Sequence, residues 1–228
     1  AGILVTGSDV KKYLLAEKIK TVKKRDYSAT ERKSVIIGRL LTSQEPVKLF
    51  ALSSGLFVTD ATISNDLDKL EDWFREQNLK LLRKPGLGVS LLGNEKDFRR
   101  AIVKYIYEHI GEQDLLNLIQ DNLDDNKDFQ IAQVSKFLLK LIDAGNWKKF
   151  EKMLTDLEYE AGYTFSDNAF IGFFVHFLLA VQRIKNHEPV DLDSENLSRL
   201  RQVKEFQFAK NLAEKISATF EIEVPETE

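Results

Sequence analysis

Hydrophobic residues recur at helical spacing along most of the 228-residue chain, and strand-like alternation is clearest near residue 80. Apolar residues three and four positions apart predict a mainly α fold. The alternating runs at 79–84 and 89–92, with turn residues at 85–88 between them, predict a β-hairpin. The predicted helices span about 9–25, 30–42, 47–56, 61–77, 98–110, 112–122, 129–143, 146–162, 167–186 and 196–219.

Between residues 47 and 92, a short helix, a tight turn, a longer helix and a hairpin follow one another. This order is the plan of a winged helix-turn-helix, in which the start of the second helix faces base edges in the DNA major groove. Thr59 or Asp60 is suited to cap that helix. Its apolar residues are spaced so that one face is buried: Ile63, Leu67, Leu70, Trp73 and Phe74.

Polar residues lie opposite that apolar face and near the hairpin turn. The candidates for DNA contact are Thr62, Ser64, Asn65 and Lys69 on the helix, and Arg83 and Lys84 on the hairpin. Hydroxyl and amide groups suit bases or phosphates, and the cations suit phosphates. The same residues also fit an ordinary capped and solvated helix, and Asp66 and Asp68 reduce the positive charge. A winged helix that contacts protein is therefore the alternative.

The residues of this module resemble a known family. The segments 57–67, 81–89 and 93–95 are similar to the second helix-turn-helix of bacterial sugar-operon activators controlled by the phosphotransferase system. That family, which includes mannitol-operon and lichenan-operon types, has two such modules in tandem. Residues 2–9 echo 88–95, so we expect 1–25 to be the remnant of a first winged-helix module. Residues 28–110 are then expected to form a winged helix-turn-helix of the Mga-like type.

Charge and composition narrow the class of protein. Residues 1–100 carry a net charge of +6 and residues 101–228 one of −9, which suggests that only the first part meets a polyanion. The absence of cysteine excludes disulfide scaffolds, thiolate zinc sites and cysteine nucleophiles. No apolar run reaches the roughly 18 residues that span a bilayer, and no signal-peptide pattern opens the chain. A cytoplasmic protein without membrane partners is expected.

One histidine, His176, interrupts the run at 164–186, which is apolar nearly all round. Such a helix is expected at the centre of a bundle, with Ser166 as its cap. One side of it carries Asn168, Gly172, His176, Ala180 and Arg183. Small neighbours would leave the imidazole accessible, and a buried, hydrogen-bonded histidine is the alternative. Because no nucleophile motif, carboxylate pair or phosphate loop accompanies it, we predict no enzyme, no catalytic residue, no metal and no cofactor.

Stretches at 165–172, 175–176 and 182–184 resemble the first half of a phosphotransferase-system regulation domain. The resemblance implies a compact helical bundle over 111–228 that often dimerises, with His176 as a phosphorylation site. The implied phosphate donor is the phosphocarrier HPr or a sugar-permease component. The expected neighbours of the phosphosite are Asp167, Asn168 and Arg183. Residues 220–228 resemble the segment before the family's second histidine, so we expect this domain to be truncated at its C-terminus.

Together these features predict a DNA-binding transcription activator of a sugar-utilisation operon, controlled by histidine phosphorylation. Operator DNA is the expected partner, and a homodimer is the expected assembly. A branch of the family binds RNA through a small β domain, whereas here a helix-turn-helix occupies that place, which favours DNA. Two alternatives stay open: a helical protein-interaction module without DNA binding, and a virulence regulator of the Mga type. The sequence names neither the sugar nor the operator sequence, nor whether phosphorylation activates.

Overall fold

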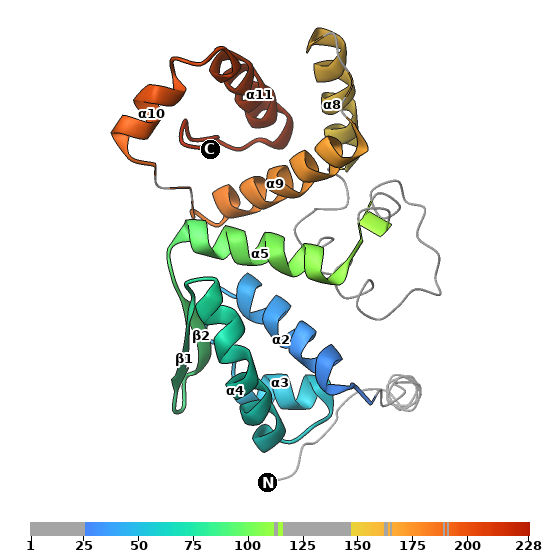
Figure 1. Cartoon of the computed structure of the whole chain (residues 1–228), viewed down its shortest axis with the longest axis vertical. Helices are drawn as coiled ribbons and strands as arrows, with labels where there is room; N and C mark the ends of the chain where they lie inside the picture. Colours follow the sequence, from blue (N-terminus) through green and yellow to red (C-terminus); the bar gives the residue numbers. More distant parts are fainter. Residues whose placement is uncertain are drawn as a thin grey trace, which may run out of the picture.

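The computed structural model describes residues 26–111, 114–115, 147–161, 164, 166–188, 190 and 192–228. This part of the chain is mainly helical, with one antiparallel hairpin, so the predicted mainly α class is confirmed. In Figure 1, three helices and the hairpin lie at one end, α8, α10 and α11 lie at the other, and α5 and α9 lie between them. The expected module remnant at 1–25 and nearly all of the helices expected at 112–122 and 129–143 lie outside the described residues.

Local capping explains where the first helices begin. The three helices are α2 (Ala29–Thr42), α3 (Leu49–Leu56) and α4 (Asp60–Glu76). Ser28 caps α2 in a reciprocal pair: its Oγ accepts from the Glu31 backbone at 3.2 Å, and its own backbone N–H donates to the Glu31 carboxylate at 2.7 Å. Thr59, rather than Asp60, caps α4. The turn between α3 and α4 begins at Phe57, which adopts the left-handed conformation (φ 56°), and α3 ends at Leu56 as predicted.

The hairpin consists of β1 (Lys80–Lys84) and β2 (Gly88–Leu92), as predicted. A backbone bridge that the sequence did not suggest joins it to the segment before α3. Val47 donates to the Val89 carbonyl at 2.8 Å, and Val89 donates back at 2.9 Å. Gly88 permits this approach, because it has φ +124° and a Cβ there would lie 2.5 Å from the Val47 carbonyl oxygen. Helix α3 therefore begins at Leu49, two residues after the predicted start at 47, because Val47 forms the bridge.

Two helix boundaries differ from the sequence expectation. Helix α5 (Glu95–His109) begins three residues before the predicted start, because Asn94 accepts from the Asp97 backbone at 2.9 Å and caps it. The single helix predicted at 196–219 is wrong: α10 (Ser194–Leu200) and α11 (Lys204–Phe220) are separate. Val203 between them is extended (φ −87°, ψ 149°) and so interrupts the helix. No residue of α10 is buried, so no core contact holds α10 in line with α11. The remaining helices are α8 (Trp147–Ala161) and α9 (Asp167–Lys185).

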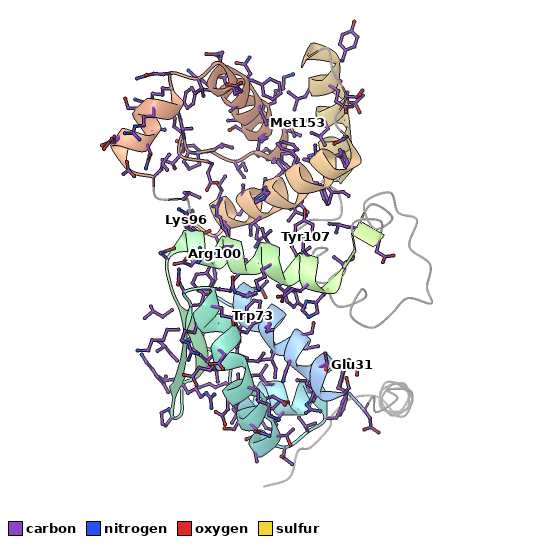
Figure 2. The ribbon with its side chains drawn as sticks, in the orientation of Figure 1. Glu31, Trp73, Lys96, Arg100, Tyr107 and Met153 are labelled. Carbon is purple, nitrogen blue, oxygen red and sulfur yellow. The ribbon has the colours of Figure 1, made fainter. Side chains whose placement is uncertain are left out.

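Burial follows the predicted apolar faces. On α4, Ile63, Leu67, Leu70 and Phe74 are buried. Trp73 is half-buried, and its Nε1 donates to the Glu108 carboxylate of α5 at 2.9 Å; Figure 2 labels it at the end of α4 nearest α5. The core therefore links α4 to the connecting helix α5. None of the described helices is both long enough and apolar enough to cross a membrane.

Candidate nucleic-acid interface and candidate phosphorylation site

The start of α4 presents most of the polar candidates to solvent. Asn65 and Lys69 are exposed, one turn apart, and Ser64 is half-buried beside them. Thr62 is also half-buried, but it belongs to the cap: its backbone N–H donates to Thr59 Oγ1 at 3.1 Å, and the two hydroxyls lie 2.9 Å apart. The exposed surface at this end of α4 is therefore formed chiefly by Asn65 and Lys69, with Ser64 at its edge.

A groove of about 400 Å³ separates α4 from the hairpin. Three cations line it, namely Lys48 before α3 and Arg83 and Lys84 on β1, and no carboxylate is among its lining residues in the described part of the chain. Ser64 lines the side formed by α4. The structure thus brings Ser64, Arg83 and Lys84 to one groove.

Two of the acidic residues of α4, Asp66 and Asp68, have different environments. Asp66 is buried, at 2% exposed, and pairs with Arg32 of α2, with its Oδ2 2.7 Å from Arg32 Nε. Its charge is neutralised inside the module and does not face the groove. Asp68 is exposed and lies 2.6 Å from Arg83 Nη1. Of these two residues, Asp68 is therefore the one that reduces the positive charge of the candidate surface.

Two residues of this surface were missed by sequence reasoning. Lys48 donates to the Gly86 carbonyl at 2.5 Å and so ties the hairpin turn to the start of α3. Phe50 lines the same groove and is 71% exposed. No local signal marks either one, because the Val47–Val89 bridge brings them beside the hairpin.

His176 lies in the middle of α9, and its side chain is exposed. The buried residues of α9 lie on its other faces and include Phe174, Val175 and Leu178. A side-chain carbon added at Gly172, one turn before His176, would meet no described atom within 4 Å. The imidazole is therefore accessible in this part of the structure. The side chains of Asp167 and Asn168, in the first turn of α9, lie outside the described residues.

Arg183 was expected beside a phosphate on His176, but its charge is already engaged. Its Nε lies 2.7 Å from Glu95 Oε1, a second nitrogen bonds Glu95 Oε2, and Nη1 lies 3.0 Å from Glu188 Oε2. The guanidinium also lies over the Phe98 ring at 5.5 Å. The side chain is 9% exposed. Arg183 thus joins the end of α9 to the start of α5.

A second arginine extends this junction. Arg99 pairs with Glu95 at 2.7 Å and with Glu228 at 2.5 Å. Burial lowers the pKa of the Arg99 guanidinium, but the hydrogen bonds that it donates to Glu228 and Glu95, together with their charges, outweigh burial and leave that pKa above its ordinary value. Three carboxylates therefore surround two guanidinium groups at the junction of α5 and α9. Figure 2 labels Lys96 and Arg100 at this end of α5.

The described residues contain no group of three or more metal-ligating side chains that could hold an ion.

Comparisons with known proteins find a family match for the last third of the chain. Residues 151–228 match the PRD domain family. Transcriptional regulator ManR of Bacillus subtilis (strain 168) is 27% identical over 205 residues, which cover 90% of this chain and 28% of that regulator. The probable licABCH operon regulator of the same organism is 26% identical over 195 residues, which cover 83% of this chain and 28% of that protein. No solved structure matches the chain.

The chain thus spans 28% of the length of these two curated relatives. The resemblance to transcription activators controlled by the phosphotransferase system is confirmed by the PRD domain and by both regulators. Both relatives are named as regulators and not as enzymes.

Proposed function

We propose that the chain is part of a DNA-binding transcriptional regulator of a sugar-utilisation operon, because residues 151–228 match the PRD domain family and two curated regulators resemble the chain. Phosphorylation of a histidine by the phosphotransferase system controls it. Residues 28–110 act as the winged helix-turn-helix, and residues 111–228 act as the regulation domain. Operator DNA, the phosphocarrier HPr or a sugar-permease component, and a second copy of the chain are its partners in the cytoplasm.

The observation that carries the DNA-binding role is the arrangement of α4 against the hairpin. Asn65 and Lys69 are exposed at the start of α4, and a groove lined by Lys48, Arg83 and Lys84 runs beside them. An amide can bond adenine in the major groove, and the cations can neutralise phosphates of the adjoining strand. This combination supports base contact from α4 and backbone contact from the hairpin.

The sensing role rests on the exposure of His176 within the PRD domain. A phosphate there brings up to two negative charges to a face that otherwise carries Gly172 and Ala180. Arg183 lies seven residues later, about 10 Å along the helix. Because Arg183 is already paired with Glu95 and Glu188, the phosphate gains no free arginine from it. The charge of the phosphate instead changes which protein surfaces can pack against the side of α9 that carries His176.

We predict that Asn65→Ala lowers discrimination at one base position by about 1–3 kcal/mol, because one side-chain contact to a base edge is lost. The measurement is fluorescence anisotropy with a duplex that the wild-type chain selects from a random pool, and with single-base variants of that duplex. Asn211→Ala is the matched control, since Asn211 is an exposed helical asparagine on α11. It should bind all duplexes as the wild type does.

Two outcomes would contradict the proposal. One is a wild-type chain that does not bind duplex DNA, or whose affinity for DNA does not fall as the salt concentration rises. Phosphate contacts release counterions, so binding through them must weaken with salt. That result would favour the alternative of a protein-interaction module. The other is an Asn65→Ala variant whose base preferences match those of the Asn211→Ala control.

A further inference from the structure

The ion pair between Asp68 and Arg83 connects the exposed side of α4 to the hairpin. Arg83 Nη1 lies 2.6 Å from Asp68 Oδ1, and the two side chains are 33% and 62% exposed. Asp68 lies one turn beyond Ser64 on α4, and Arg83 lines the groove on the hairpin side. Such an exposed pair contributes little to stability, so a competing partner can separate it.

DNA offers a competing partner to each member of the pair. A phosphate presents oxygens that match a guanidinium as well as a carboxylate does. A carboxylate only accepts hydrogen bonds, so in the major groove it can bond only the amino groups of cytosine or adenine. The adenine amino group has an acceptor on each side, adenine N7 and thymine O4, which repel a carboxylate, whereas cytosine N4 has an acceptor, guanine O6, on one side only. Cytosine N4 is therefore the base group that suits Asp68.

The location of Asp68 fits this exchange. It lies three residues beyond Asn65, on the same exposed side of α4 and within its first three turns. Asp66, by contrast, is buried against Arg32 and has no access to DNA. Over a base without an amino group, Asp68 would face phosphates and acceptors without a partner, which disfavours that sequence.

We propose that Asp68 is a specificity-determining residue that exchanges Arg83 for cytosine N4 when the chain binds DNA, while Arg83 passes to a phosphate. This inference rests on the proposed DNA-binding function. In the free protein the pair holds Arg83 at the groove. On the preferred sequence both members gain new partners, and on other sequences the Asp68 charge opposes binding.

The test compares Asp68→Asn with Asp72→Asn, which removes the same charge from α4. Asp72 is paired within the helix to Arg75 at 2.6 Å and is 75% exposed. Binding is measured by anisotropy to the random duplex pool and to a duplex selected from it by the wild type. For Asp68→Asn we expect tighter binding to the pool and an about tenfold fall in the ratio of selected to pool affinity. Repeating the selection should show that the preference for cytosine at one position is lost.

Arg83→Gln should weaken binding to both duplexes alike, since it removes a phosphate contact. An unchanged affinity ratio and an unchanged cytosine preference in Asp68→Asn would overturn the inference while leaving the proposed function intact. An Asp72→Asn variant that behaves like Asp68→Asn would also overturn it, because the effect would then be one of net charge. A wild-type chain that does not bind the random pool, so that no duplex can be selected from it, would instead refute the proposed function itself.

Discussion

Glu95→Gln is expected to lower the free energy of unfolding by about 2–3 kcal/mol. Glu95 accepts charged hydrogen bonds from both Arg183 and Arg99, and its side chain is 14% exposed. A charged hydrogen bond contributes about 1.5–3 kcal/mol, and breaking a buried pair costs more when a charge loses its partner. In the variant, Glu188 still pairs with Arg183 and Glu228 still pairs with Arg99. The loss of unfolding free energy is therefore smaller than for a buried charge left without any partner. Urea unfolding followed by circular dichroism measures it.

Glu195→Gln is the matched control for this change. Glu195 also pairs with an arginine, Arg199, at 2.7 Å, but the two side chains are 76% and 73% exposed. Because exposed pairs contribute about 0–1 kcal/mol, this variant should unfold almost as the wild type does. Equal losses in the two variants would mean that the pairs at the start of α5 do not hold α9.

Phe150→Ala is expected to cost about 3–5 kcal/mol, the largest loss that we predict. Phe150 of α8 is 1% exposed, and its ring lies 4.2 Å from Phe177 and 5.1 Å from Phe174, centroid to centroid. Its removal leaves a cavity between α8 and α9, the helix that carries His176. Phe50→Ala is the control, because Phe50 is 71% exposed and its replacement should change stability by less than about 0.5 kcal/mol. A loss below about 1 kcal/mol in Phe150→Ala would contradict the packing described for α8 and α9.

Helix α4 and the hairpin could be predicted from the sequence because local chemistry determines them. Thr59 caps α4, Ile63, Leu67 and Phe74 repeat at helical spacing, and the residues at 85–88 suit a tight turn. The predicted start of α5, at Phe98, lies three residues after the observed start. The apolar period begins only at Phe98, while the cap is Asn94. The asparagine was visible in the sequence and was given too little weight as a capping residue.

Pairings between distant residues could not be read from the sequence. Arg183 and Glu95 are 88 positions apart. The sequence around Arg183 does not indicate whether its guanidinium pairs with a carboxylate of α5 or with a phosphate on His176. The exposure of His176, in contrast, was expected from the sequence. Its small neighbours Gly172 and Ala180 were the signal that one side stays open. The Asp68–Arg83 pair depends on how the hairpin lies against α4, which periodicity does not specify.

The central claim is that phosphorylation of His176 changes how the winged helix binds DNA. The chain is incubated with the phosphoenolpyruvate-driven phosphotransfer proteins, the acid-labile phosphate is mapped by mass spectrometry, and affinity for the selected duplex is measured before and after. The account predicts label on His176 alone and an affinity change of about fivefold or more, as expected for coupled sites. Label that persists in His176→Ala, or label on His176 that leaves DNA affinity unchanged, would contradict it.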